Sequence, residues 1–411
     1  MTIGVANFYG KRLTEARLSR GLFMKTLGDM VGLSGAAIGR YEAGLDKPQA
    51  DKLDTISKVL GFQQHFFLSS PWPEDLQPVF WRSRSSESKS AREMTEQRMF
   101  WLCEIFEFLE SHLDFPDVAL PKLKLPTDFR LITQETIEVA AESVRADWGI
   151  GRAPIPDMFL ALENIGVPVS TLDIQSEKQD GFCFFSNALD RPFVGINING
   201  VSACRARFDA AHELGHLVLH ANVKPEQERD AASKKLIESQ AHRFASALLF
   251  PREAFLSKVN HISLDYFCGL KREWGVSIAA MVKRASDLEL IDADTYMSLF
   301  QNMNRRRWRG RMREPYDDPR DMPLEQPRML RRSAQVIVDA GLFGSRAFLA
   351  ALPHPQKEIQ SLLGLNDNFF SESKVVRLPT AKPVQNELDA IDLESGNVIA
   401  FTRTAKSDFR Y

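Results

Sequence analysis

The stretch Phe208–His220, FDAAHELGHLVLH, decides how this sequence is interpreted because it contains the pattern His-Glu-x-x-His. On an α-helix residues four apart share a face, so the imidazoles of His212 and His216 can reach one metal ion. Glu213 can then reach a water molecule held by that ion. The neighbouring residues are apolar, and polar groups placed among them are costly unless they are satisfied. The pattern therefore predicts a zinc site on a buried helix.

A third ligand is expected on the helix that follows. The stretch 236–251, LIESQAHRFASALLFP, has apolar residues at helical spacing and ends at a proline. Glu238 is the predicted third ligand, because glutamate from a second helix completes the zinc site in many hydrolases. The metzincin extension H-x-x-G-x-x-H is absent, since Leu219 and Asn222 occupy the positions of its glycine and third histidine.

Three further polar side chains are predicted to support the ligands or the reaction. His242 and His220 each lie one helical turn beyond a predicted ligand, and Asp209 lies about one turn before one. Asp209 is placed to orient an imidazole, and His242 to assist the reaction itself. The alternative for the motif itself is that H-E-x-x-H has recurred by chance and that its buried histidines only form hydrogen bonds. Glu238 is then an exposed helical glutamate, and His220 a histidine at a helix end.

The residues around this stretch predict a predominantly helical α+β protein. Three short β-rich runs, at 167–174, 180–187 and 192–200, precede the histidine-bearing helix and predict a small antiparallel sheet. Residues 7–68 instead show the spacing of short helices around a Gly-Leu-Ser turn. This N-terminal part is therefore expected to be an all-α domain containing a helix-turn-helix.

The Ser-rich stretch 82–90, RSRSSESKS, is typical of a linker and suggests where the first domain ends. At 411 residues the chain is long enough for several domains. The expected parts are the helix-turn-helix domain at 1–70, a linker and connecting helix at 71–130, the metal-binding domain at 131–300, and a helical or mixed C-terminal region of unknown role at 301–411.

Composition limits the classes of partner and compartment. The net charge is only −2, from 52 basic and 54 acidic residues, so a nucleic-acid site must be a local patch. The stretch 304–315, with six arginines around Trp308, is a candidate contact to DNA or an acidic protein, although a surface arginine run is more often simply solvated. Four cysteines without a C-x-x-C pair favour the reducing cytoplasm, and no run approaches the ~20 apolar residues of a membrane span.

The metal-binding stretches resemble a known family. RFDAAHELGHLVLH (207–220) followed by IESQAHRFASALLFP (237–251) is similar to the ImmA/IrrE-type zinc metallopeptidases, and the similarity extends upstream to 145–169. The resemblance implies a zincin-like fold and zinc as cofactor. The residues expected to act are the ligands His212, His216 and Glu238 and the general base Glu213. Asp209 departs from the threonine usual at its position.

The segment 12–61 resembles the helix-turn-helix of XRE/Cro-type repressors, including the pattern I-x-x-x-E-x-G-x-x-x-P. The resemblance implies that the helix beginning at Ser34 enters the major groove of operator DNA. Among its exposed residues only Arg40 is a strong reader of base edges. The residues expected at DNA are Ser34, Gly35, Ala36, Gly39 and Arg40 at the bases, and Lys11, Arg12, Arg17, Arg20 and Lys25 at phosphates. A domain kept for protein contacts is the alternative.

Together these observations predict a cytoplasmic, homodimeric transcriptional regulator with a zinc metallo-endopeptidase domain. Its substrate is expected to be a repressor or antitoxin protein, or its own linker at 82–90, and cleavage would control stress, phage or mobile-element genes. The alternative is a repressor or antitoxin without proteolytic activity, whose peptidase-like domain senses a ligand or binds a partner. Glu213 separates these hypotheses, because a structural zinc site needs no general base.

Overall fold

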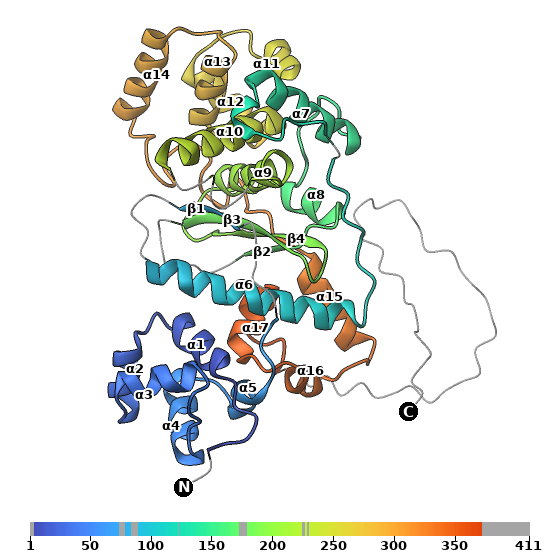
Figure 1. The fold of residues 1–411 in the computed structure, drawn as a ribbon. Coiled ribbons are helices and arrows are strands. Elements are labelled where there is room, and N and C mark those ends of the chain that lie inside the picture. The colour runs from blue at the N-terminus through green and yellow to red at the C-terminus, as the bar shows by residue number, and fades with distance from the viewer. Residues whose placement is uncertain are drawn as a thin grey trace, which may run out of the picture.

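The computed structural model describes residues 4–73, 79–83, 89–121, 123–171, 179–223, 227 and 230–371. Residues 84–88 of the Ser-rich stretch and the C-terminal residues 372–411 lie outside this part of the chain. The described elements are mostly helices, with one small sheet near the middle of the molecule (Figure 1). This confirms the predicted helical α+β class. Among the described helices, none combines the length and apolar character needed to cross a membrane.

Five short helices form the N-terminal domain, and the predicted helix-turn-helix is confirmed. The turn forms because Gly32 adopts a left-handed φ of 66° and Ser34 accepts a hydrogen bond from the Ala37 amide, which caps the next helix. The helices are α1 (Gly10–Ser19), α2 (Met24–Val31), α3 (Gly35–Glu42), α4 (Ala50–Leu60) and α5 (Gln64–Leu68).

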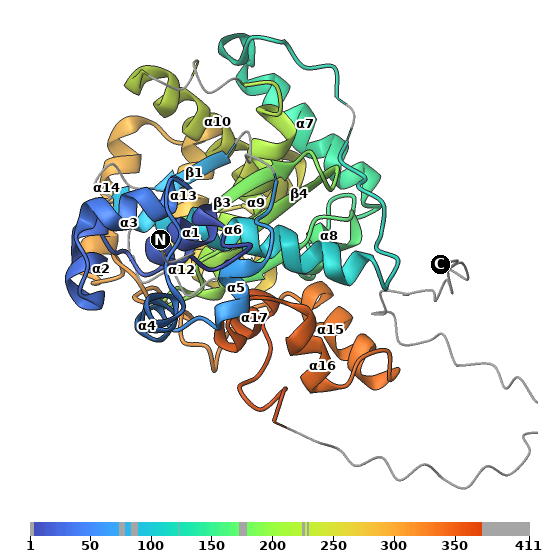
Figure 2. The same cartoon turned by 60° about the horizontal axis from the view of Figure 1, so that its bottom comes forward.

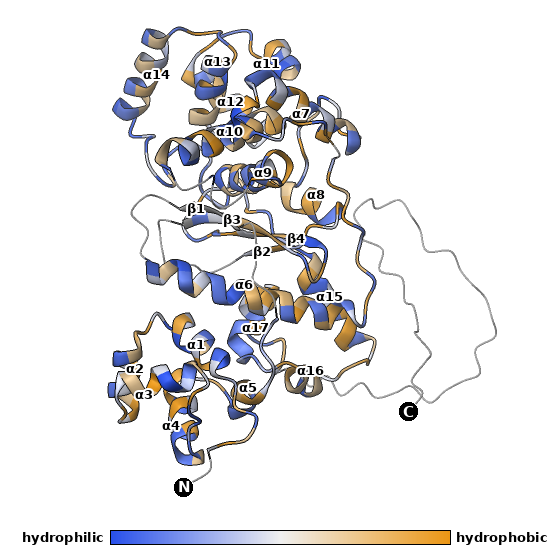
Figure 3. Cartoon of the chain, viewed as in Figure 1, coloured by the Kyte–Doolittle hydropathy of each residue, from blue (hydrophilic) through white to orange (hydrophobic). Residues whose placement is uncertain are grey.

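The N-terminal domain packs directly on a long helix, α6 (Lys89–Glu110). Arg12 of α1 is fully buried and donates hydrogen bonds to Glu15 and to Glu104 of α6, and the Trp101 indole also donates to Glu15. Figure 3 shows α6 changing from hydrophilic near its start to hydrophobic in its second half. The segment expected to be a linker and connecting helix therefore contributes to the core, and removing one partner of this buried ion pair would be costly.

The sheet contains β1 (Val79–Ser83), β3 (Gln179–Ser186), β4 (Arg191–Ile196) and β2 (Val169–Thr171), in that order. The predicted antiparallel sheet is wrong for one pair, because β2 runs parallel to β4. The hairpin places β4 between β3 and β2 and reverses the direction of the chain. As a result β4 is antiparallel to β3 and runs in the same direction as β2. At the other edge β1, from the expected linker segment, pairs antiparallel with β3.

Helices cover both faces of the sheet, and successive residues of β3 contribute to different cores. Cys183 belongs to the core beneath α9, whereas Phe182 and Phe184 belong to the core shared with α6. On the first side lie η1 (Phe129–Leu131), α7 (Gln134–Asp147), α8 (Met158–Asn164), α9 (Ala203–Leu219), α10 (Ala231–Leu249), α11 (Arg252–Lys258), α12 (Leu264–Trp274), α13 (Ile278–Asp287) and α14 (Ala293–Arg305).

On the second side, the C-terminal helices pack against both α6 and strand β2 of the sheet. These helices are α15 (Met329–Asp339), α16 (Ser345–Ala351) and α17 (Gln356–Leu363). Figure 2 shows them gathered beside α5, and His354 of this region contacts the ring of Phe66 with centroids 5.9 Å apart. Residues 330–365 of the C-terminal region thus contribute to the core around α6.

Candidate metal centre and DNA-binding surface

The two helices of the candidate metal centre, α9 and α10, approach each other closely at Gly215. A Cβ atom at this position would lie 3.1 Å from the Phe244 ring and 3.2 Å from the backbone of Ala241. Glycine therefore permits a contact that any larger residue would push apart. This close approach brings Glu238 of α10 beside the histidines of α9.

Three predicted ligands converge at this contact. The Nε2 atoms of His212 and His216 lie 3.0 Å apart. The carboxylate of Glu238 lies 3.3 Å from His212 Nε2 and 3.5 Å from His216 Nε2. Both histidines are fully buried, whereas about a third of the Glu238 side chain is exposed, so the site opens on the Glu238 side.

The geometry and chemistry of these donors fit zinc. Two donors bound about 2.0–2.1 Å from a tetrahedral ion lie about 3.3 Å apart, and the three separations at this site bracket that value. Two imidazoles and one carboxylate are also a ligand set of catalytic zinc sites. Burial alone would raise the pKa of the Glu238 carboxyl. The hydrogen bonds and charges of His212 and His216 lower it by more, so the net pKa falls well below the ordinary range and the group is a carboxylate.

Glu213 lies on the side of α9 that faces the sheet. It is fully buried, and a Cβ atom added to Gly181 of β3 would lie 3.0 Å from Glu213 Oε1 and 3.2 Å from the Gly195 carbonyl oxygen. The absence of a side chain at Gly181 therefore makes the space in which the carboxylate sits. Glu213 directly follows His212 on the helix, and its carboxylate lies in the space beside Gly181 of β3.

His220, fully buried, connects a predicted ligand to the protein interior. Its Nδ1 is 3.0 Å from His216 Nδ1, and its Nε2 is 3.0 Å from Gln240 Oε1. The Gln240 amide nitrogen donates to the carbonyl oxygens of Phe129 and Ile132, at 2.8 and 3.2 Å. These two bonds orient the amide so that its oxygen accepts from His220 Nε2.

The protons along this chain follow from that orientation. Burial, with a smaller contribution from His216, lowers the pKa of His220 to about 3, so the ring is neutral at pH 7. A neutral ring that donates from Nε2 must accept at Nδ1. His216 therefore donates a hydrogen bond from Nδ1. Its Nε2 lone pair faces the side chains of His212 and Glu238, the other two predicted ligands.

His242 and Asp209 occupy different surroundings. His242 is exposed, with Nδ1 2.7 Å from the Glu238 carbonyl oxygen, and its ring meets that of His212 edge-on with centroids 4.5 Å apart. His242, His212 and Glu238 each offer a donor atom within 4.8 Å of the others. Asp209 is fully buried and accepts a 2.9 Å hydrogen bond from Arg205.

Helix α3 presents small residues on the surface predicted to meet DNA. Ala36 is exposed, and the Ser34 hydroxyl accepts from the Ala37 amide as a helix cap. A Cβ atom at Gly35 would lie 3.0 Å from the backbone of Lys25, so this glycine serves the packing of α3 on α2. Gly39 is half-buried near Met24.

The cations predicted to meet DNA are divided between the surface and the interior. Lys25 is exposed, and Arg40 is more than half exposed while paired with Asp46 at 2.6 Å. Arg17 is buried, because its guanidinium binds both oxygens of Glu42, so the prediction of a phosphate contact does not fit its placement.

The same correction applies to Arg12 and Arg20. Arg12 is in the buried pair with Glu104, and Arg20 donates to the Leu60 carbonyl and to Glu358 of α17. Lys11 is exposed, with Nζ 2.9 Å from the Trp72 carbonyl oxygen. Much of the basic charge of α1 thus fixes the N-terminal domain to its neighbours.

Comparison with known proteins identifies both domains. Residues 162–286 match the family model of the IrrE N-terminal-like domain, and residues 13–63 match that of the helix-turn-helix. An SPbeta prophage-derived uncharacterized HTH-type transcriptional regulator, YonR, from Bacillus subtilis (strain 168) is 32% identical over 60 residues. That match covers 15% of this chain and 56% of YonR. The chain thus joins a helix-turn-helix domain of the XRE type to an ImmA/IrrE-type domain of the metallopeptidase-like family, as the resemblances predicted.

Four supporting residues were not predicted from the sequence. Gly215 stands between the two histidines, and a glycine inside an otherwise apolar helix indicates a close contact. Gln240, Gly181 and Arg205 gave no comparable signal, because their roles depend on elements that meet only in the folded chain. Arg205 donates to Asp180 of β3 as well as to Asp209, which ties α9 to the sheet.

Proposed function

We propose that the protein is a DNA-binding transcriptional regulator whose second domain is a zinc metallo-endopeptidase. The observation that supports this most strongly is the convergence of His212, His216 and Glu238 at separations that suit one tetrahedral ion. The protein substrate is proposed to be a repressor or antitoxin, or the chain itself at residues 82–90. Its cleavage would release stress, phage or mobile-element genes.

The three donors would hold Zn²⁺ and leave one position of the ion open. Zinc in such a site supplies a Lewis acid and lowers the pKa of bound water to about 7. Glu213 would take a proton from the attacking water and pass it to the leaving amine of the peptide. Glu213 is buried against β3 and directly follows His212, which leaves its carboxylate little freedom and would keep the base in place when a peptide arrives.

His220 and Gln240 are proposed to position His216. The chain of hydrogen bonds fixes the proton on His216 Nδ1 and directs the Nε2 lone pair to the ion. His242 is the proposed contact to the developing oxyanion, because it lies beside two of the ligands on the open side of the site. Asp209 is proposed to act through Arg205, which holds α9 in register with β3.

The helix-turn-helix domain is proposed to bind operator DNA as part of a homodimer. Arg40 would leave its ion pair with Asp46 and form hydrogen bonds to a base edge instead. Lys25 would contact a phosphate. The small residues Ala36 and Gly39 offer little direct readout, so we expect modest sequence specificity.

The metal content of the purified protein tests the site. Wild type, His216→Ala and Glu238→Ala would be compared after removal of loose metal, with circular dichroism to verify folding. We expect close to one zinc per wild-type chain and a large loss in both variants, because a two-ligand site holds zinc weakly. Undiminished zinc in both folded variants would reject this ligand set.

The non-proteolytic alternative makes a different prediction for Glu213→Gln. If the domain only senses a ligand, this variant should keep zinc and lose no function of the wild type. If the domain is a peptidase, zinc and DNA binding survive while cleavage is lost, because only the base is removed.

A further inference from the structure

A cavity of about 550 Å³ lies directly beside the candidate metal centre. It is enclosed by α9, α13, α14 and the segment that follows α14, and both Phe208 and His242 line its wall. His242 belongs to the group of donors around the metal position. A cavity that shares a residue with a hydrolytic centre is the place where a substrate side chain would sit.

The arginine-rich stretch 304–315 forms one side of this cavity and is firmly anchored. Glu314 accepts hydrogen bonds from the backbone amides of Ile278 and Ala279 at the start of α13, at 2.8 and 3.0 Å. The buried ammonium of Lys271 donates to Glu314 and to Asp317, at 3.0 and 2.6 Å. Because these contacts fix the end of the stretch, its residues at the cavity are held in place rather than solvated at random.

The cavity is lined by four cationic and three acidic side chains. Two of its acidic side chains, Glu314 and Asp317, already bind Lys271. The third, Asp180, lies 2.8 Å from one arginine of the cavity and 3.6 Å from another. The four cationic residues of the lining are Arg205, Lys283, Arg309 and Arg311. Arg205 also pairs with Asp209, and Lys283 pairs with Asp287 of its own helix. Among the described residues, Arg309 is thus the cation of the lining to which no carboxylate is bound.

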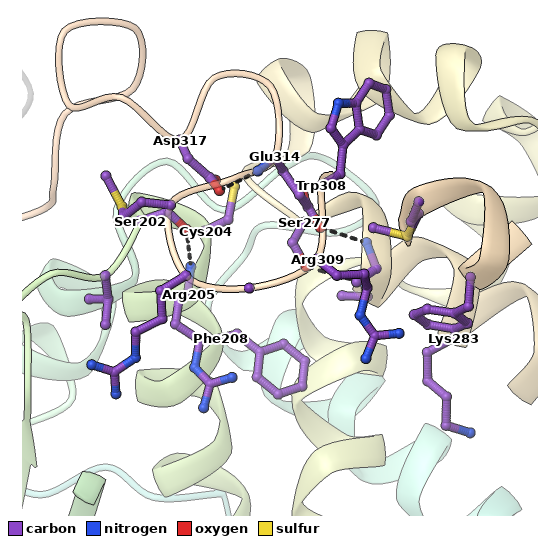
Figure 4. A pocket seen from close by; sticks show the side chains of 18 of the residues that line it. Ser202, Cys204, Arg205, Phe208, Ser277, Lys283, Trp308, Arg309, Glu314 and Asp317 are labelled. Atoms are coloured by element: carbon purple, nitrogen blue, oxygen red, sulfur yellow. Dashed lines mark hydrogen bonds between the residues drawn. The ribbon is translucent and has the colours of Figure 1, made fainter. Parts of the chain in front are cut away.

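Aromatic surface lies between these cations. Figure 4 shows the ring of Phe208 with Arg205 on one side and Arg309 and Lys283 on the other, their charged ends directed to the same side of the cavity. The Arg309 guanidinium also lies over the ring of Phe300, 4.8 Å from its centroid. A ligand that suits this lining combines an apolar or aromatic group with negative charge.

We propose that the cavity binds an acidic segment of the protein substrate, and this inference rests on the proposed peptidase function. A large apolar or aromatic side chain of the substrate enters between Phe208 and Phe300. An adjacent carboxylate pairs with Arg309, and a second pairs with Lys283 in place of Asp287. A cavity of this size admits one or two side chains, whereas a DNA duplex would remain outside it. The sequence of the substrate next to the cleaved bond is therefore selected by the segment that follows α14.

The test measures peptide binding to the full-length, zinc-loaded Glu213→Gln protein, which retains peptides without cutting them. The probe is a positional library of short fluorescent peptides. We expect peptides with Asp or Glu beside an aromatic residue to bind about tenfold more tightly than the same peptides with Lys at the acidic position. Adding Arg309→Glu should reverse this preference, which a misfolded protein would not do.

Arg305→Glu is the matched control, because Arg305 is exposed in the same arginine-rich stretch but does not line the cavity. It should leave the acidic preference unchanged, and Lys283→Glu should weaken it. The proposal is overturned if acidic peptides are not preferred, or if Arg305→Glu and Arg309→Glu act equally. It is also overturned if a single-stranded oligonucleotide displaces the peptides and itself depends on Arg309.

Cleavage of the preferred peptides by zinc-loaded wild type separates this proposal from the proposed function. Binding that follows the acidic preference without any cleavage would support the cavity and contradict the peptidase. Cleavage that ignores charge at the acidic position would support the peptidase and contradict the cavity.

Discussion

The metal centre and helix α3 are both built on helices, but their functional surfaces are organised in opposite ways. At the candidate metal centre His212, Glu213 and His216 are fully buried, Gly215 brings α9 against α10, and a chain of hydrogen bonds positions His216. On α3 the outward residues are small, and the arginine among them pairs with a neighbouring exposed carboxylate.

This difference shows where each function acquires its specificity. The proposed peptidase chemistry would require few groups in fixed positions, and a fold that restrains them before a substrate arrives suits that requirement. DNA contacts form with flexible cations at the surface, and affinity depends on charge more than on a fixed arrangement. Substitutions should therefore act through packing at the metal centre and through charge on α3.

The largest effect is expected for a pair of glycine substitutions, one in each region. Gly215→Ala should destabilise the fold by about 1–3 kcal/mol and weaken zinc binding, because its Cβ meets the backbone of α10. Gly39→Ala should stabilise α3 by up to about 1 kcal/mol, because its Cβ meets only the flexible end of Met24. The stability of each variant is measured by thermal unfolding and its zinc affinity by titration. Equal changes in stability for Gly215→Ala and Gly39→Ala would contradict the proposed contrast in packing.

A smaller effect is expected from the residues behind His216. His220→Phe should lower zinc affinity about 10–100-fold, because His216 Nδ1 loses the acceptor that fixes its ring. Competition with a chelator measures this affinity. His261→Phe, at an exposed position, is the control and should have no effect. Wild-type affinity in His220→Phe would show that the chain to Gln240 is not needed to position the ligand.

The smallest effect is expected at the DNA-binding surface. Lys25→Ala should reduce the slope of log affinity against log salt by about 1, because it removes a single phosphate contact. Arg17→Ala should leave that slope unchanged and destabilise the domain, because its charge is paired with Glu42 inside the protein. Titrations of a labelled operator at several salt concentrations distinguish them, and a reduced slope in Arg17→Ala would contradict the assigned role.

The sequence predicted the metal centre better than the basic surface, for a physical reason. Two histidines four residues apart on an apolar helix indicate one shared partner, so the convergence of His212, His216 and Glu238 could be predicted in advance. Arginine serves equally well in a buried ion pair and at a phosphate, so Arg17 could not be placed without knowing where Glu42 lies.

The fold was predictable to a similar degree. The helices and the three runs that became β2, β3 and β4 follow from local patterns. The contribution of β1 and the parallel pairing of β2 with β4 depend on which distant segments meet, as does the use of Gln240 behind His220.

Peptide cleavage by wild type and Glu213→Gln, each holding the same amount of zinc, tests the central claim most directly. Both proteins would be incubated with a mixture of random peptides, and new termini would be identified by mass spectrometry. The proposed function predicts zinc-dependent cleavage by wild type and a loss of at least about 100-fold in the variant, because a positioned general base contributes about that much. Cleavage at the same rate by both proteins, or by neither, would contradict it.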